Sequence, residues 1–300
     1  IYKSSSGYKE YFDNEVKNHI LLKNDLKYKE YIVEMIEYFT HESSYGNHGI
    51  IIFELCGNTL EDLLKSTQEG TLPEPIVKHI MKQVVNGLRI FHEKNLIHTD
   101  LKPENILLTK EFKLINSFDE IVVKISDLGS SLKEDEIDTY SVGTDQYLPP
   151  EVVMRADYDK TIDIWGIGNI IFELITGENL IDPGQYYNDD DEETLSDDDD
   201  DNNTTNSSEC SDDDSEDCGD FEYIHTHISL FHKILGPIPS ELIQSGENYD
   251  LFYCKSGKLN RIPRYIDKTT IKEIFENEYN FTDPETINNL DDVLKFILKY

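Results

Sequence analysis

A long acidic segment divides this chain of 300 residues into parts that can fold and a part that cannot. Between Gln185 and Glu222 the sequence has eighteen Asp and Glu residues, no Lys or Arg, and few apolar side chains. Such a segment buries too little apolar surface to offset the conformational entropy that is lost on folding. We therefore predict that residues 185–222 are disordered and that the fold is built from the residues on either side.

The chain as a whole has the composition of a globular protein, because 38% of its residues are hydrophobic and 11% are aromatic. The formal net charge is −34, and more than half of it lies in the acidic segment. A surface so acidic repels nucleic-acid phosphates and anionic membranes and attracts cationic groups. We expect basic protein partners and no nucleic-acid or membrane partner, while the sequence leaves the oligomeric state open.

The cysteine spacing and the hydropathy pattern both favour an intracellular protein. The four cysteines fit neither a dense disulfide framework nor a CxxC metal site, so we expect reduced thiols. No apolar run approaches the ~20 residues of a membrane-spanning helix. These features predict a location in the cytoplasm or the nucleus.

The hydrophobic periodicity predicts helices and short strands. Apolar residues four apart give the helix opened by Pro73 a core face of Ile76, Ile80, Val84 and Leu88. Residues 161–176 are apolar on nearly every face, which indicates a fully buried helix that Gly177 ends. The other expected elements are a helix at 10–23 and strands at 50–54, 106–108 and 121–125.

Four short motifs follow one another in a fixed order along these elements. The loop His98–Asn105 reads HTDLKPEN, and after it come Asp127-Leu128-Gly129, Pro149-Pro150-Glu151 and, on the buried helix, Asp163-Ile164-Trp165-Gly166. In this order they resemble the catalytic loop, the DFG and APE motifs and the DxWxxG motif of protein kinases. A single HxD or DxG triplet would be weak evidence, whereas four motifs in the right order are strong evidence.

The resemblance implies an α+β fold with the two lobes of a protein kinase. Residues 1–55 would form a partial N-lobe, with the end of its third strand, the C-helix and its fourth and fifth strands. Residues 56–184 would form the part of the mainly helical C-lobe that holds the catalytic and activation loops, and residues 223–300 its region from helix G to helix H. The family's Gly-rich loop and ATP-binding lysine would precede Ile1, so we expect a fragment truncated at both ends.

The same resemblance assigns the catalytic residues. Asp100 would accept or orient the proton of a substrate hydroxyl, and Lys102 would contact the transferred phosphoryl group. Asn105 and Asp127 would hold Mg2+, a hard cation that prefers oxygen ligands. Asp163 would brace the main chain of the catalytic loop.

Further residues match the part of a kinase that receives ATP. Phe53, Glu54 and Cys56 correspond to the gatekeeper and the hinge, which bind adenine through main-chain hydrogen bonds, and Leu107 corresponds to the floor beneath adenine. Glu15 corresponds to the ion-pair partner of the ATP-binding lysine. We interpret the Cys56 side chain as a small buried hydrophobe rather than a reactive thiol.

The sequence of the catalytic loop also indicates which group of protein kinases the chain resembles. HTDLKPENILL, together with ILGPIPS at residues 234–240, is similar to SR-protein kinases and LAMMER kinases of the CMGC group. Thr99 stands where many kinases have an arginine that draws in an activation-loop phosphate, so we expect activity that depends little on such phosphorylation. Tyr147 is followed by Leu148 where CMGC kinases usually have arginine, so the chain departs from the group's pattern at this position.

We therefore interpret the chain as a serine/threonine protein kinase that transfers the γ-phosphate of ATP to protein hydroxyls. The family resemblance suggests basic Arg/Ser-rich segments as its substrates. The alternative is a pseudokinase or acidic scaffold that binds basic partners without catalysis. Asp100, Lys102, Asn105 and Asp127 together argue against this alternative, because a scaffold has no need for all four.

Overall fold

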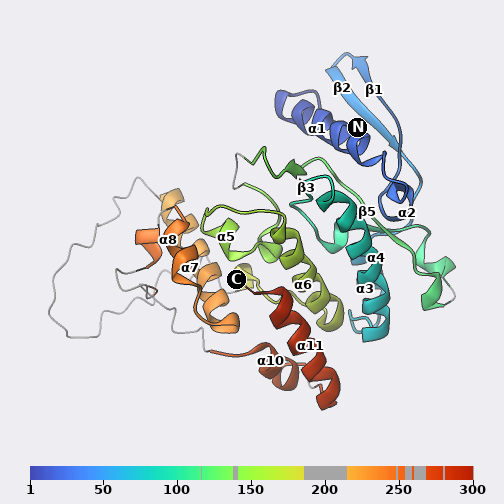
Figure 1. The fold of residues 1–300 in the computed structure, drawn as a ribbon. Coiled ribbons are helices and arrows are strands. Elements are labelled where there is room, and N and C mark those ends of the chain that lie inside the picture. The colour runs from blue at the N-terminus through green and yellow to red at the C-terminus, as the bar shows by residue number, and fades with distance from the viewer. Residues whose placement is uncertain are drawn as a thin grey trace.

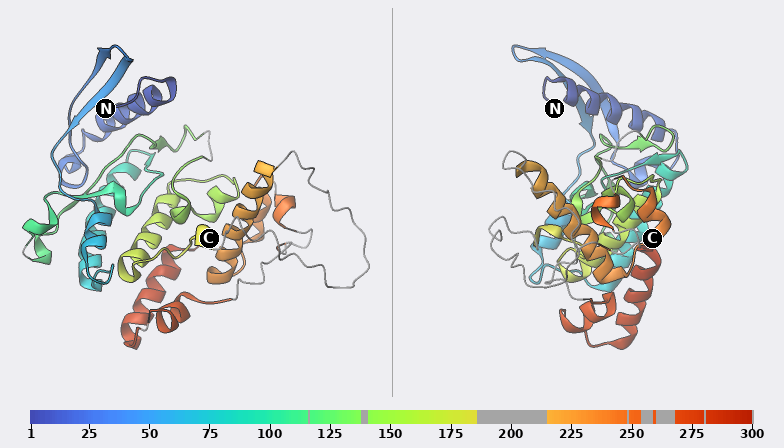
Figure 2. Two further views of the ribbon diagram at one scale, coloured as in Figure 1. Left: turned by 180° about the vertical axis from the view of Figure 1, so that it is seen from behind. Right: turned by 90° about the vertical axis from the view of Figure 1, so that its left-hand side faces the viewer.

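The computed structural model describes residues 1–115, 117–137, 141–185, 215–247, 249–253, 259, 268–279 and 281–299. These residues form a small lobe that contains a β-hairpin and a larger lobe that is mainly helical (Figure 1). The last two helices lie at the end of the larger lobe that is farthest from the hairpin, as the views in Figure 2 also show. The α+β fold with two lobes that the sequence predicts is confirmed.

The small lobe consists of α1 (Ser6–Leu22), α2 (Tyr28–Tyr31), β1 (Met35–Ser43) and β2 (Gly46–Phe53). The two strands pair antiparallel, with Met35 opposite Phe53. α1 packs Phe12 and Val16 into a small apolar cluster with Met35. At Gly49 a Cβ atom would lie 2.4 Å from the Phe12 ring, so glycine is needed where the hairpin passes under the helix.

The larger lobe contains the helices α3 (Leu60–Ser66), α4 (Glu74–His92), α5 (Pro150–Val153), α6 (Thr161–Thr176), α7 (Ser215–Leu235), α8 (Ser240–Ser245), α9 (Tyr249–Phe252), α10 (Ile271–Asn277) and α11 (Pro284–Ile297). α4 buries the predicted Ile80, Val84 and Leu88, each of which stabilises the fold by roughly 1.5–3 kcal/mol. α6 is buried on most of its surface and ends at Gly177, whose φ of +83° is left-handed. Both predicted helices are confirmed, although Ile76 of the predicted core face of α4 is only partly buried.

Short strands and 3-10 turns connect the helices of the larger lobe. They are β3 (Leu96–Ile97), η1 (Pro103–Asn105), β4 (Ile106–Leu108), η2 (Phe112–Leu114), η3 (Phe118–Glu120), β5 (Val123–Ile125), β6 (Leu132–Lys133), η4 (Asp145–Tyr147) and η5 (Pro183–Gln185). β3 pairs with β6, and β4 pairs with β5. These two antiparallel ladders place the loop that follows β3 beside the loop that follows β5.

Several predicted boundaries shift in the structure. The first helix begins at Ser6 rather than residue 10, and the hairpin strand begins at Gly46 rather than residue 50. The strand expected from residue 121 begins at Val123, because Phe118–Glu120 forms a 3-10 turn before it. Among the described residues, no helix is both long enough and apolar enough to cross a membrane.

The expected disorder of residues 185–222 is wrong at both ends of that segment. Residues 186–214 lie outside the described residues, but Gln185 ends η5 and α7 begins at Ser215. α7 packs Ile228 and Phe231 into the main core. Extending a helix that tertiary contacts have already formed requires little free energy per residue, so the acidic residues before this apolar part can continue it.

Candidate active site

A buried carboxylate on α6 holds the loop after β3 in place. Asp163 is 2% exposed, and it accepts hydrogen bonds from the main-chain N–H groups of His98 at 2.9 Å and Thr99 at 3.0 Å. His92 Nε2 lies 2.9 Å from the same carboxylate. The loop also contains strain, since Thr99 has a left-handed φ of +72°. The predicted brace between Asp163 and this loop is therefore present.

Asp100 lies at the centre of a hydrogen-bonded group. Its Oδ1 accepts from the Thr144 hydroxyl at 2.7 Å, and its Oδ2 lies 3.0 Å from Lys102 Nζ. Lys102 also donates to Thr144 Oγ1 at 2.7 Å. Asn105 Nδ2 donates to the main-chain oxygen of Asp100 at 2.8 Å. The structure thus brings the predicted Asp100, Lys102 and Asn105 together.

The charge state of Asp100 follows from this group. Burial alone would raise the pKa of its carboxyl group, but the hydrogen bonds from Thr144 and Lys102 and the charge of Lys102 outweigh burial. The pKa of Asp100 therefore lies below its ordinary value. A carboxylate that is ionised at neutral pH can accept a hydrogen bond from a hydroxyl group.

The two predicted magnesium ligands lie at the same end of the β4–β5 ladder, Asn105 just before β4 and Asp127 just after β5. Ser126 donates to the main-chain oxygen of Asn105 from its N–H at 2.9 Å and from its hydroxyl at 3.0 Å, which fixes the next residue, Asp127, beside Asn105. Asp127 has a left-handed φ of +60°, and its Oδ1 accepts from the Gly129 N–H at 3.3 Å.

This pair of oxygen donors fits Mg2+, which is commonly held by one or two protein side chains and by substrate phosphates. Among the described residues there is no group of three or more His, Cys, Asp or Glu side chains that could hold a metal ion by itself. The donors present therefore suit a metal that arrives with a phosphate ligand.

α1 holds the turn that contains Asp127. Asn18 Nδ2 donates to the main-chain oxygens of Leu128 at 3.1 Å and Ser131 at 2.9 Å. One turn earlier on the helix, Asn14 Nδ2 donates to the main-chain oxygens of Gly129 at 2.8 Å and Ser131 at 2.9 Å. These four bonds link the small lobe to the segment that carries the candidate metal ligand.

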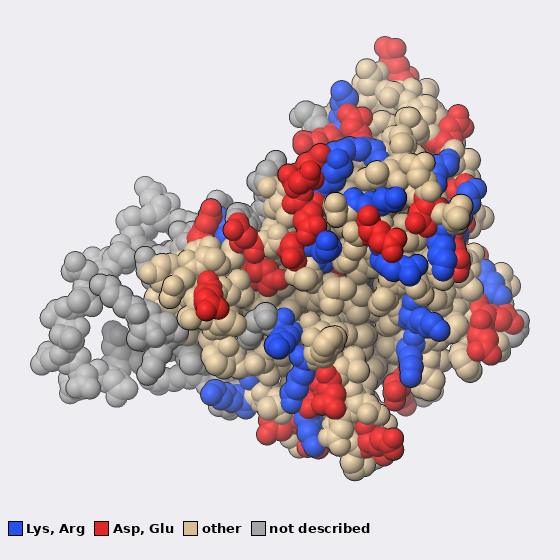
Figure 3. All heavy atoms as spheres, viewed as in Figure 1, with Lys and Arg blue, Asp and Glu red and all other residues tan. Residues whose placement is uncertain are grey.

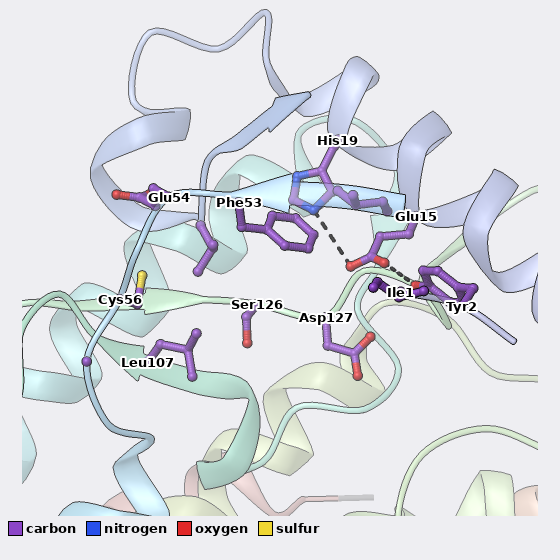
Figure 4. Close-up of a pocket in the computed structure, with 13 residues that line it drawn as sticks. Ile1, Tyr2, Glu15, His19, Phe53, Glu54, Cys56, Leu107, Ser126 and Asp127 are labelled. Atoms are coloured by element: carbon purple, nitrogen blue, oxygen red, sulfur yellow. Dashed lines mark hydrogen bonds and ion pairs between the residues drawn. The ribbon is translucent and has the colours of Figure 1, made fainter. Parts of the chain in front are cut away.

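A cleft of about 480 Å3 lies between the lobes and is shown in Figure 4. Six of the nine predicted site residues line it, namely Glu15, Phe53, Glu54, Cys56, Leu107 and Asp127. Within the cleft, the Glu54 side chain is turned to the side opposite Asp127. Its carboxylate is bound by Lys124 Nζ at 2.6 Å, so only the main chain of Glu54 is placed to meet a ligand.

Glu15 lies at the other end of the cleft. The Tyr2 hydroxyl donates to its carboxylate, and His19 Nε2 lies 4.0 Å away (Figure 4). Burial raises the pKa of Glu15, although the hydrogen bond from Tyr2 opposes this effect. Burial also lowers the pKa of His19 to about 4, so this ring is neutral near pH 7.

Sequence reasoning missed three kinds of site residue. The sequence analysis assigns no role at this site to Thr144, to Lys124 or to the two asparagines of α1. Their partners are far away in the chain, since Thr144 meets Asp100 across 44 positions and Lys124 meets Glu54 across 70. The one available signal was the place of Lys124 within an otherwise apolar strand.

Comparison with known proteins adds independent evidence. Residues 2–227 match the model of the protein kinase domain. The chain is 26% identical to "Serine/threonine-protein kinase SRPK" of Physarum polycephalum, over 95% of this chain and 71% of that protein. It is 28% identical to "Dual specificity protein kinase CLK2" of Homo sapiens, over 91% of this chain and 48% of that protein. The resemblance predicted from the catalytic loop is confirmed.

The contact between Thr144 and Asp100 gives a testable prediction. In a Thr144→Val variant, Asp100 loses one hydrogen bond, so its pKa should rise and the acid limb of the pH–kcat profile should move to higher pH. Loss of a hydrogen bond to a charged group should lower kcat by about tenfold to a hundredfold. Thr144→Ser, which keeps the hydroxyl group, is the control. A valine variant with the wild-type profile would contradict the assigned contact.

Proposed function

Because the chain belongs to the protein kinase family, we propose that it transfers the γ-phosphoryl group of ATP to serine or threonine hydroxyls of protein substrates. The observation that carries this proposal is the joining of Asp100, Lys102 and Thr144 by bonds of 2.7–3.0 Å. Asn105 and Asp127 lie directly beside this group.

Each residue has a physical task in such a transfer. The substrate oxygen forms a bond to the γ-phosphorus, and the bond between that phosphorus and the oxygen bridging to the β-phosphate breaks. Asp100 orients the hydroxyl group and accepts its proton. Lys102 Nζ, which lies 3.0 Å from Asp100 Oδ2, can donate to a phosphoryl oxygen held above it. Thr144 fixes both side chains in place.

The nucleotide would be received by the cleft and the metal by the two oxygen donors. Leu107 would lie beneath adenine, and the main chain at Glu54 and Cys56 would bind its edge. Asn105 and Asp127 would hold Mg2+, which neutralises phosphate charge when it is bound.

Asp100→Asn tests the catalytic proposal. An amide cannot accept the proton, so kcat for a serine peptide should fall by about a hundredfold to ten-thousandfold. Circular dichroism and the melting temperature should stay at wild-type values. Asp157→Asn, which changes an exposed aspartate, is the matched control. Wild-type kcat in Asp100→Asn would contradict the assigned role, and absent transfer by the wild-type protein would favour the pseudokinase alternative.

We further propose basic substrates, and three carboxylates near the catalytic group support this. Glu104 lies between Lys102 and Asn105, and its Oε2 is buried without a hydrogen-bond partner among the described residues. Burial, reinforced by the nearby Glu104 carboxylate, raises the pKa of Glu173 to about 7. Asp145 directly follows Thr144 and is exposed. A cationic side chain next to the phosphorylated residue would relieve the repulsion between these groups.

The described ends of the acidic segment lie near this region. η5, which contains the first residue of the segment, contacts α7, whose first residues are the last ones of the segment. The Tyr223 hydroxyl on α7 donates to Asp145 Oδ2 at 2.8 Å. Over the small lobe, in contrast, Lys and Arg side chains alternate with Asp and Glu on the face shown in Figure 3. Long-range attraction of a basic peptide would therefore be directed to the side of the larger lobe that carries Asp145.

This second proposal predicts a salt-dependent effect of the segment. Replacing its fourteen Asp and Glu residues between 186 and 214 by Asn and Gln keeps its length and leaves α7 intact. We expect kcat/KM for an Arg-rich peptide to fall about tenfold at low salt and little at high salt, because screening weakens attraction beyond ~8 Å at physiological ionic strength. A neutral peptide is the control. An unchanged salt dependence for the Arg-rich peptide would contradict steering by this segment.

A further inference from the structure

We infer that Lys124 and Glu54 form a clamp that positions the hinge main chain for adenine, so that this ion pair sets the affinity for nucleotides. The inference rests on the proposed kinase function for its biological meaning, but nucleotide binding tests it without any phosphoryl transfer. Neither side chain needs to touch the nucleotide. Both therefore act as positioning residues.

The clamp consists of three bonds that meet at one residue. Lys124 Nζ donates to Glu54 Oε1 at 2.6 Å, and the same oxygen accepts from the Glu34 N–H at 2.7 Å. The Glu54 N–H in turn donates to the Glu34 main-chain oxygen at 2.9 Å. Glu54 is thus tied through its main chain to the segment before β1 and through its side chain to β5. Glu54 also lines the cleft.

Burial makes the ion pair matter more than a surface pair. The side chain of Lys124 is 9% exposed and that of Glu54 is 27% exposed. An exposed pair contributes little because water and salt screen it, whereas a buried charge that loses its partner is strongly destabilised. If the hinge moved away from β5, the Lys124 ammonium group would lose its partner in a largely buried site.

The position of Lys124 relates this pair to the nucleotide site. In the β4–β5 ladder Lys124 lies opposite Leu107, the residue expected beneath adenine. Three positions after Lys124 comes Asp127, the candidate metal ligand. The clamp therefore holds the hinge at a fixed distance from the strand pair that supports both the adenine floor and the metal ligand.

Both charges of the ion pair lie near the thiol of Cys56. Burial raises the pKa of this thiol, the Glu54 carboxylate raises it further, and the Lys124 ammonium group lowers it. Cys56 lines the cleft two positions after Glu54. The ion pair therefore lies close to the residue whose main chain would bind adenine.

The test measures nucleotide affinity by calorimetry in Lys124→Met and in Glu54→Gln. Glu54→Gln keeps an oxygen for the Glu34 N–H, so it removes mainly the charge. We expect the Kd for adenosine and for Mg-ADP to rise about tenfold in each variant. The double variant should show no larger rise than either single variant, because each change already breaks the same clamp.

Three further measurements distinguish a shift of the hinge main chain from a general loss of stability of the protein. The Kd for magnesium pyrophosphate, which has no adenine, should stay within about twofold of the wild-type value. Lys110→Met is the control. It removes an ion pair in the same β4–β5 connection, in which Lys110 Nζ lies 2.7 Å from Glu120 Oε2. The two side chains are 39% and 38% exposed, so this is a surface pair. Phosphoryl transfer by the wild-type protein is measured separately, so failure of the proposed function would be recognised by itself.

The inference is overturned by an unchanged adenosine Kd in both single variants, by an equal weakening of pyrophosphate, or by strictly additive effects in the double variant. A tenfold rise confined to adenine-containing ligands, absent in Lys110→Met, supports it.

Discussion

Asp163 places a carboxylate in the core at the start of α6, where two main-chain N–H groups of the catalytic loop and the His92 ring bind it. A buried charge is tolerated only where hydrogen bonds replace its hydration. The bonds to Asp163 therefore hold His98 and Thr99 in a loop whose backbone is unfavourable at Thr99. These bonds also fix the position of Asp100, the next residue. Its contacts with Lys102 and Thr144 therefore depend on Asp163.

The segment after Asp127 is held by the protein's own side chains. The Thr99 hydroxyl donates to the Ser130 main-chain oxygen at 3.1 Å, at the position where many kinases use an arginine and a phosphate. Asn14 and Asn18 bind the same segment from α1, and Lys17 pairs with Glu136 at 2.8 Å. The low dependence on phosphorylation stays a prediction, and these contacts support it because uncharged hydrogen bonds and the ion pair of Glu136 already link the segment to both lobes.

Local signals allowed much of the fold and site to be predicted. The apolar residues of α6 and its terminal Gly177 predicted the bounds of that helix correctly. The order of the motifs predicted that Asp100, Asn105 and Asp127 are neighbours. The acidic composition predicted disorder at Ser215, but α7 begins there. The helix is stabilised by the core packing of its later apolar residues, which the local composition does not reveal. The outward turn of the Glu54 side chain could not be predicted either, because it depends on Lys124, which lies far away in the chain.

We propose that this cleft binds a magnesium nucleotide in an orientation set by the hinge and by the loop that Asp163 holds. The most direct measurement is a crystal structure of the protein with Mg2+ and a non-hydrolysable ATP analogue. We expect adenine on Leu107 within hydrogen-bond distance of the main chain at Glu54 and Cys56, with the metal on Asn105 and Asp127. Nucleotide bound elsewhere, or metal that contacts neither Asn105 nor Asp127, would contradict the account.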